Sequence, residues 1–257
     1  MGPEMNEVER ARRWVREAER IVVLTGAGIS AESGVPTFRG DGGLWRTYRA
    51  EELATPGAFA RDPRLVWEWY GWRRERVAAC EPNAAHLALA RLALDRDGVR
   101  IVTQNVDGLH TAAARAAAGE RDPEPALPIE LHGSIFRVRC TACGTRREDR
   151  GPIAADREDS LPRCGRCGSL LRPDVVWFGE ALDPALLDEA ARAAADADLC
   201  LVVGTSGIVH PAAGLPALTR AGGGRIVEVN PHPTPISDAA ELCIRAPAAV
   251  AVPGITG

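Results

Sequence analysis

Residues 21–31 read Ile-Val-Val-Leu-Thr-Gly-Ala-Gly-Ile-Ser-Ala, an apolar run that leads directly into two glycines. An apolar run without alternation is typical of a strand buried on both faces of a parallel sheet. The glycines fit the pattern G-x-G-x-x-G/A, which brings backbone N–H groups and the start of a helix to a pyrophosphate. The stretch therefore predicts the first strand and turn of a dinucleotide-binding sheet, with cofactor contacts at Gly26, Ala27, Gly28, Ser30 and Ala31.

Strand-like and helix-like segments alternate through most of the chain, which is the signature of a doubly wound sheet. We therefore predict an α/β fold with a Rossmann-like, doubly wound parallel sheet. The expected strands are 21–25, 100–103, 129–131, 199–203, 225–229 and 242–244, and the expected helices are 83–95, 109–118, 184–195 and 212–221.

Two segments interrupt this alternation. Residues 40–80 form a loop followed by an aromatic helix, which should begin at Asp62 as N-cap and Pro63 at the first helical position. Residues 136–171 are rich in Cys, Gly, Arg and Asp and show no hydrophobic periodicity. We expect these segments to form a smaller inserted domain, with 40–80 as its helical part and 136–171 as its zinc-binding part. The dinucleotide-binding domain would comprise residues 1–39, 81–135 and 172–257.

Four of the seven cysteines form two Cys-x-x-Cys pairs, Cys140/Cys143 and Cys164/Cys167. Each pair places two thiolates on one tight turn, and four thiolates can complete a tetrahedral site that leaves no position open for substrate. A redox dithiol or unrelated cysteines are the alternatives, but two pairs at this spacing favour one structural Zn²⁺. The zinc site alone says nothing about catalysis.

Composition narrows the class of protein. The formal net charge is −4 and the pI about 5.8, without the basic stripe expected of a nucleic-acid reader. No run approaches the roughly 18–20 apolar residues of a membrane span, and the charged N-terminus lacks the apolar core of a secretory signal. We therefore expect a cytoplasmic protein that binds neither nucleic acid nor membrane. Its oligomeric state stays open, and a monomer is compatible with the sequence.

An ordinary hydride-transfer dehydrogenase fits poorly. The acidic residue expected about 20 residues after the glycines is missing, and a zinc module occupies the middle of the chain. A candidate ribose partner lies much later, in Glu228-Val-Asn230 at a strand end, and Gly204-Thr205-Ser206-Gly207 follows another apolar strand. Such loops are binding loops in many open sheets, although each could also be an ordinary turn between strand and helix.

Three further motifs, taken with the glycine loop and the cysteine pairs, resemble the sirtuin family along nearly the whole chain. They are Gly34-Val-Pro-Thr-Phe38-Arg39, Thr103-Gln-Asn-Val-Asp-Gly-Leu-His110 and His132-Gly-Ser134. The resemblance implies an NAD-dependent protein deacylase. In such an enzyme the acyl-amide oxygen attacks the anomeric carbon of NAD, nicotinamide leaves, and the acyl group ends on ADP-ribose.

The resemblance also implies roles for individual residues. His132 would be the general base that deprotonates a ribose hydroxyl, a task that suits a side chain with a near-neutral pKa. Asn105 would position the ribose and a water, Asp107 would bind the nicotinamide carboxamide, and Phe38 would shield the reacting carbon from water. The complete set of cofactor contacts would add Arg39, Gln104, Gly204, Thr205, Ser206, Asn230 and Ala248.

The same resemblance points to the substrate. The segment Val175–Glu180 resembles the strand that pairs with the peptide backbone, although it could equally be a plain apolar strand of the small domain. Its candidate contacts are Val176, Trp177, Phe178, Gly179 and Glu180.

Tyr70 and Arg73 on the aromatic helix are three residues apart and so share a face. A guanidinium binds carboxylates bidentately and a phenol adds a hydrogen bond, which matches the sirtuin branch that removes succinyl and malonyl groups. Ala54 resembles the small residue that widens the acyl tunnel in that branch. The alternative is a solvated arginine beside a core tyrosine.

Two other functions stay open. One is mono-ADP-ribosyl transfer, which shares the cleavage of nicotinamide but uses another acceptor. The other is a non-catalytic protein that senses NAD or uses the zinc module for binding, against which the combination of His132, Asn105 and Asp107 weighs.

Overall fold

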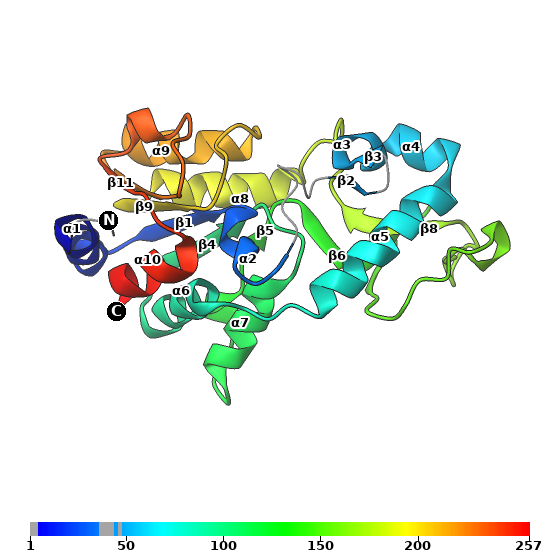
Figure 1. The fold of residues 1–257 in the computed structure, drawn as a ribbon, viewed down its shortest axis with the longest axis horizontal. Helices are drawn as coiled ribbons and strands as arrows, with labels where there is room; N and C mark the ends of the chain where they lie inside the picture. Colours follow the sequence, from blue (N-terminus) through cyan, green and yellow to red (C-terminus); the bar gives the residue numbers. More distant parts are fainter. Residues whose placement is uncertain (1–4, 36–43, 46–47) are drawn as a thin grey trace.

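The computed structural model describes residues 5–35, 44–45 and 48–257. Within these residues the larger part is a six-stranded sheet whose neighbouring strands are all parallel. The order is β11-β10-β9-β1-β4-β5, so β1 (Ile21–Thr25) lies inside the sheet (Figure 1). The other strands are β4 (Val99–Thr103), β5 (Ile129–Glu130), β9 (Leu199–Val203), β10 (Arg225–Val229) and β11 (Leu242–Ile244).

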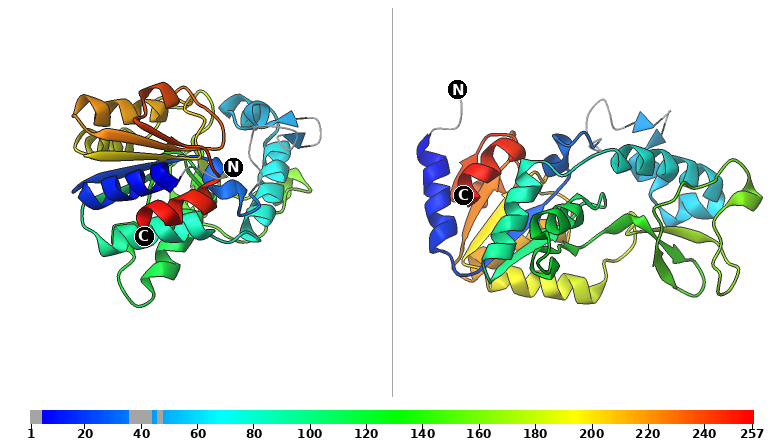
Figure 2. Two further views of the ribbon diagram at one scale, coloured as in Figure 1. Left: turned by 60° about the vertical axis from the view of Figure 1, so that its left-hand side comes forward. Right: turned by 90° about the horizontal axis from the view of Figure 1, so that it is seen from below.

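Side chains of β1 alternate between two cores, as expected for a strand covered on both faces. Ile21 and Val23 pack with α1, α6, α7 and α10, whereas Val22 and Leu24 pack with α8 and α9. Helices therefore cover both faces (Figure 2), and the predicted doubly wound fold is confirmed. These helices are α1 (Met5–Glu17), α6 (Ala84–Asp95), α7 (Leu109–Ala118), α8 (Pro184–Ala195), α9 (Leu215–Ala221) and α10 (Ala248–Thr256).

The order of strands reverses beside β1. The chain runs from β1 outward through β4 and β5, and then returns to the opposite side of β1 at β9. Open α/β sheets bind ligands at the carboxyl ends of the strands at such a reversal. Thr25 at the end of β1 lies opposite Thr103 of β4 and Val203 of β9, so the loops that follow these three strands begin side by side.

A smaller part lies at one end of the molecule (Figure 1). Its antiparallel sheet has the order β7-β6-β8, and a shared core joins this sheet to α5 (Pro63–Ala78). The start of α5 is as predicted, because the Asp62 carboxylate accepts from the Leu65 N–H at 2.9 Å and Pro63 is its first residue. The other elements are β2 (Leu44–Trp45), β3 (Tyr48–Arg49), α3 (Ala50–Leu53), α4 (Pro56–Arg61), β6 (Gly133–Cys140), β7 (Arg146–Glu148) and β8 (Leu171–Val175).

The expectation that residues 136–171 lack periodicity is wrong for β6. Val138 and Cys140 are buried in the core, whereas Arg137 and Arg139, which alternate with them along the strand, are partly exposed. This period of two is the pattern of a strand with one face toward solvent, and it stood in the sequence. The proposed boundaries between the domains remain a prediction.

Short helical turns complete the chain, and two longer helices were not predicted. Helices α1 and α10 lie side by side at the end away from the smaller part (Figures 1 and 2), where Arg12 Nε donates to the Gly254 carbonyl at 2.6 Å. In the described ranges no helix combines the length and the apolar character needed to cross a membrane. The short turns are α2 (Gly28–Ala31), η1 (Glu124–Ala126), η2 (Glu158–Ser160), η3 (Ala212–Gly214) and η4 (Ser237–Ala239).

Candidate active site

The loops after β1 and β9 touch through glycine backbone. The Gly28 N–H donates to the Gly204 carbonyl at 2.7 Å. A Cβ on Gly28 would lie 2.8 Å from the Gly204 Cα, and a Cβ on Gly204, whose φ is +61°, would lie 2.4 Å from the Ile29 nitrogen. Both positions therefore require glycine, because the loops pack backbone against backbone. The two loops therefore lie together at the reversal of the sheet, where open α/β sheets bind their ligands.

The helix expected after the glycines is only one turn long. Ala27 is the N-cap of α2 and Ala31 is its last residue. Such a short helix adds little dipole toward a bound phosphate.

Three predicted polar side chains meet beneath this loop. Ser30 Oγ donates to Asp107 Oδ2 at 2.8 Å and accepts from Asn105 Nδ2 at 3.2 Å. Asn105 Nδ2 also donates to the Gly26 carbonyl at 3.1 Å, and the Leu109 N–H donates to Asp107 Oδ1 at 2.9 Å. All three side chains are buried. Burial raises the pKa of the Asp107 carboxyl, although its hydrogen bonds and nearby Arg73 oppose the shift.

Two histidines that received no role from the sequence lie against this cluster. His86 Nε2 is 3.3 Å from Ser30 Oγ, and His110 Nε2 is 2.9 Å from Thr25 Oγ1. Their rings meet edge to face with centroids 4.8 Å apart. Burial lowers the pKa of His86 to about 4 and that of His110 well below its ordinary value, so both are neutral near pH 7. A histidine in an apolar helix pattern carries no signal of such a contact.

Thr205 connects three of the loops. Its hydroxyl accepts from Gln104 Nε2 at 2.9 Å, and its carbonyl accepts from Asn230 Nδ2 at 2.7 Å. The predicted residues after β4, β9 and β10 are thus held together by direct contacts. Ser206 is partly buried beside Thr205, and Ala248 is buried as the first residue of α10.

Glu228 is not available to a ribose. It is fully buried, and its carboxylate accepts from Thr234, from Ser237 Oγ at 2.6 Å and from Arg245 at 2.6 Å. Arg245 also donates to the carbonyls of Asn230 and His232, at 3.4 and 3.3 Å. Glu228 therefore braces the loop after β10, and Asn230 is the side chain of the predicted pair that faces the neighbouring loop.

His132 stands just after β5, as predicted. Its Nδ1 lies 2.8 Å from the Gln104 carbonyl oxygen. Because a carbonyl only accepts, Nδ1 carries the hydrogen and Nε2 presents a lone pair. Burial lowers the pKa of His132, and the hydrogen bond to Gln104 partly offsets the shift. The ring is thus held in the tautomer that a general base requires.

The segment after β8 bridges the two parts of the molecule. Val176 N donates to the His132 carbonyl at 3.0 Å, and Phe178 N donates to the Ala54 carbonyl at 2.9 Å. Unlike the strand implied by the resemblance, the strand of the small sheet ends at Val175, where pairing with β6 ends at Gly133. Phe178 is 51% exposed.

The Glu180 carboxylate binds back onto this segment and stabilises its end. Its carboxylate accepts from Arg172 at 2.5 and 3.0 Å, from Arg139 at 3.0 Å and from the Trp177 N–H at 2.9 Å. Three donors occupy the carboxylate, so Glu180 stabilises the turn that contains Gly179 (φ +88°) rather than offering a free charge.

Tyr70 and Arg73 share a face of α5, as their spacing predicts. The Arg73 guanidinium lies over the rings of Trp69 and Tyr70, with its central carbon 4.9 and 5.5 Å from their centroids. Tyr70 is fully buried, and its hydroxyl accepts from Trp177 Nε1 at 2.9 Å. Burial lowers the pKa of Arg73, while Tyr70 and Asp107 favour its charged form. The charge of Arg73 is therefore close enough to the Asp107 carboxyl to interact with it.

The predicted cofactor contacts Phe38 and Arg39 fall outside the described residues.

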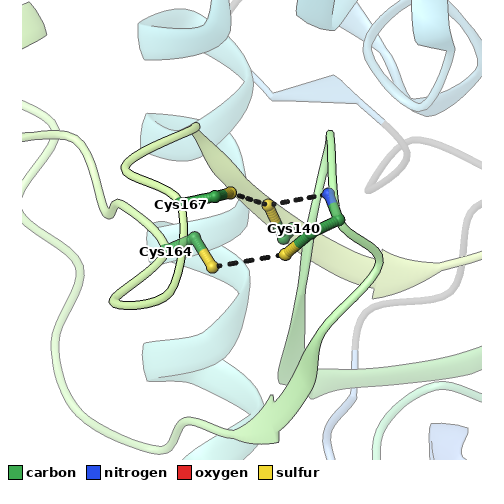
Figure 3. Close-up of side chains that lie close together, drawn as sticks. Cys140, Cys164 and Cys167 are labelled. Carbon is green, nitrogen blue, oxygen red and sulfur yellow. Dashed lines mark hydrogen bonds between the residues drawn. The ribbon is translucent and has the colours of Figure 1, made fainter.

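The four predicted zinc ligands come together from two similar turns (Figure 3). Cys140 and Cys167 sulfurs are 3.4 Å apart, Cys143 and Cys164 sulfurs are 3.6 Å apart, and all four lie within 4.8 Å of one another. Zn–S bonds of about 2.3 Å in a tetrahedron give sulfur spacings of about 3.8 Å. The cluster thus fits one structural Zn²⁺. Gly144 (φ +71°) and Gly168 (φ +75°) close the two turns.

Replacing Cys164 by serine is expected to remove the metal and to destabilise the small sheet. Loss of a structural metal is among the changes that cost about 4 kcal/mol or more. Zinc content by atomic absorption should fall from one per chain to near zero, and the Tm should drop. Cys80→Ser is the control, since Cys80 is outside the cluster; retained zinc in Cys164→Ser would contradict the assignment.

Comparisons with known proteins agree with this geometry. A model of the Sir2 family matches residues 26–211. An NAD-dependent protein deacylase of Thermococcus kodakarensis is 50% identical over 248 residues, which cover 95% of this chain and 92% of the relative. The structure of a Sir2 homologue in complex with NAD superposes with a TM-score of 0.87 at 45% identity, covering 99% of this chain and 94% of the other. A triple-mutant Sir2 homologue bound to 2'-O-acetyl ADP ribose gives 0.87 at 46% identity, covering 96% and 94%.

Proposed function

The chain belongs to the Sir2 family, and we propose that it uses NAD to remove acyl groups from the lysine side chains of proteins. The products would be nicotinamide, the free lysine and O-acyl-ADP-ribose. One observation carries this proposal at the level of the site. His132 presents Nε2 as a base at the same sheet edge where the Ser30–Asn105–Asp107 cluster and the glycine loops meet.

The residues at that edge suit the parts of NAD. NAD supplies a labile bond between nicotinamide and ribose, and a ribose that receives the acyl group. The close contact between Gly28 and Gly204 brings the loops after β1 and β9 together where the pyrophosphate would lie. Thr205, Ser206 and Asn230 would hold the adenosine half, with Ala248 and the loop residues Gly26, Ala27 and Ala31 beside it.

The buried cluster would hold the reacting half of NAD. Asn105 would position the ribose, and Asp107 would bind the nicotinamide carboxamide. Both side chains are oriented by Ser30 and by backbone groups, so little reorganisation is needed on binding. Gln104 aligns His132 through its carbonyl, and His132 Nε2 would take a proton from a ribose hydroxyl. Phe38 and Arg39 are proposed to cover the site.

The substrate peptide would add a strand along Val176–Phe178. One edge of this segment is bonded to His132 and Ala54, and on the other edge Glu180 occupies the N–H and the carbonyl of Trp177. A substrate strand would therefore pair with the main chain next to Trp177. Recognition of backbone places few demands on peptide sequence, which suits an enzyme that acts on many proteins. Gly179 and Glu180 fix the end of the segment.

We further propose a preference for acyl groups that end in a carboxylate. Arg73 would supply the charge and Tyr70 the hydroxyl, and Ala54, whose carbonyl binds the bridging segment, would widen the acyl tunnel by its small side chain. Succinyl and malonyl chains carry the matching carboxylate, whereas an acetyl group uses neither partner.

The reducing cytoplasm, where four thiolates stay free to bind metal, is the proposed location.

A panel of acetyl-, malonyl- and succinyl-lysine peptides, assayed with and without NAD, tests the function. We expect nicotinamide release that requires both peptide and NAD, with the acyl group recovered on ADP-ribose and acidic acyl chains preferred. ADP-ribose attached to protein instead would favour mono-ADP-ribosyl transfer. No nicotinamide release with any peptide would contradict the enzymatic proposal as a whole.

A further inference from the structure

Tyr70 has one unused hydrogen in a buried position. A phenol has a single O–H donor and two acceptor positions. The Tyr70 hydroxyl accepts from Trp177 Nε1 at 2.9 Å and makes no other hydrogen bond within residues 5–35, 44–45 and 48–257. Since Tyr70 is 0% exposed, water does not readily supply the missing acceptor. A buried donor without an acceptor is unfavourable, so the arrangement suits a ligand that brings an acceptor and displaces the groups that cover the hydroxyl.

The Trp177 indole fixes the direction of the Tyr70 O–H bond. Because the Trp177 N–H occupies the acceptor side of the Tyr70 oxygen, the hydroxyl cannot donate toward Trp177 and must donate away from it. Burial raises the pKa of Tyr70, so the hydroxyl keeps its hydrogen near neutral pH. The Arg73 guanidinium, 5.5 Å from the Tyr70 ring centroid, provides a cation on the same helix face. An O–H donor beside a guanidinium is the combination that a carboxylate accepts.

Contacts with three neighbouring residues fix the position of Trp177. The Arg172 guanidinium stacks on its ring, with the central carbon 3.2 Å from the centroid, and the Phe59 ring lies 5.4 Å away. Glu180 accepts from the Trp177 backbone N–H and from Arg172. Arg172 is buried and also donates to the Val175 carbonyl at 2.8 Å. The indole N–H is thus fixed in direction before substrate arrives.

We propose that Trp177 is a positioning residue for acidic acyl groups, which it serves by committing the Tyr70 hydroxyl to donate to the acyl carboxylate. Arg172 and Glu180 support it by clamping the indole. This inference rests on the proposed acidic-acyl preference. It gives Trp177 a role in selectivity among acyl groups, distinct from the role of its backbone in holding the peptide segment.

Trp177→Phe tests the proposal, because it keeps an aromatic ring and removes the N–H. The readout is the ratio of kcat/KM for a succinyl-lysine peptide to that for an acetyl-lysine peptide. We expect this ratio to fall about 3- to 10-fold, as for loss of one neutral hydrogen bond. Tyr70→Phe should lower it about 10-fold or more, as for a hydrogen bond to a charged group. The double variant should be no worse than Tyr70→Phe alone, because Trp177 acts through Tyr70.

Trp67→Phe is the matched control. Trp67 is also fully buried on α5, and its indole N–H donates to the Leu171 carbonyl at 3.0 Å, but it does not contact Tyr70's hydroxyl. Its loss should lower the Tm without changing the ratio. A ratio that stays constant in Trp177→Phe, or effects of Trp177→Phe and Tyr70→Phe that simply multiply, would overturn the inference.

Assays of the wild-type protein distinguish failure of the proposed acidic-acyl preference from failure of the proposed role of Trp177. If it hydrolyses acetyl but not succinyl peptides, the acidic-acyl preference fails and the inference fails with it. If it prefers succinyl peptides and Trp177→Phe leaves that preference intact, only the role of Trp177 is wrong. The Tm of each variant, measured by circular dichroism, reports whether the variant has folded, so a misfolded protein is not mistaken for one with altered selectivity.

Discussion

Replacing His132 by alanine is expected to lower kcat/KM by about 10²- to 10⁴-fold, the usual contribution of a general base. The Gln104 carbonyl holds Nδ1–H, so only Nε2 is available to accept a proton, and alanine offers no substitute. Nicotinamide release in the presence of acyl peptide measures the loss, and calorimetric titration with NAD measures binding. His132→Asn should behave like alanine, because an amide is no base near pH 7. Near-normal turnover in either variant would refute the assignment of His132.

The pH profile of the wild type reports on the same imidazole. Burial lowers the pKa of His132 below the ordinary value of about 6.5. A base works in its neutral form, so activity is full above this pKa and is lost as the pH falls through it. The acid limb of kcat/KM should therefore have its midpoint below about 6.5. A midpoint clearly above that value would point to a different group.

Replacing the half-buried Arg73 by methionine is expected to lower kcat/KM for succinyl peptides by about 30- to 5,000-fold, or roughly 2–5 kcal/mol for an acyl carboxylate that loses its charged partner within the complex. Turnover of acetyl peptides should fall far less, because an acetyl group offers no carboxylate. Methionine keeps an unbranched apolar chain that can pack on Trp69, whose ring lies under the Arg73 guanidinium. Steady-state kinetics with matched succinyl and acetyl peptides measure the two effects.

Arg76→Met is the control for Arg73→Met. Arg76 lies on the same helix, also stacks on a tryptophan ring (Trp72, at 4.9 Å), and is exposed. Removing it changes the charge of α5 by the same amount but leaves in place the Arg73 guanidinium that lies over the Tyr70 ring. Equal losses of desuccinylation and deacetylation in Arg73→Met would argue that the arginine supports the fold and not acyl selection.

The sheet was predictable because its physical signal is local. Strands with both faces covered are continuous apolar runs, and 21–25, 199–203 and 225–229 were predicted with their observed bounds. The cysteine pairs and the Asp62-Pro63 helix start were also predictable, since turn geometry and capping depend on residues close in the chain.

Contacts between distant segments were beyond such reasoning. The sequence explained Gly28 and Gly204 as separate turn residues, whereas in the structure each glycine makes room for the other. Glu228 had the position of a ribose ligand, but Arg245, 17 residues later, occupies its carboxylate. No sequence pattern indicated the contacts of His86 and His110, because their partners Ser30 and Thr25 come from another part of the chain.

The mutual contact of Gly28 and Gly204 also restricts how this scaffold can be re-engineered for a different nucleotide. Neither loop can be altered at its glycine without displacing the other, so single-site libraries at these two positions should yield mostly misfolded proteins. Changes are better tolerated at the partly buried side chain of Ser206, whereas Asn230 Nδ2 binds the Thr205 carbonyl and so holds two loops together. Cofactor preference in this fold can therefore be altered at side chains around the Gly28–Gly204 contact, but not at the two glycines themselves.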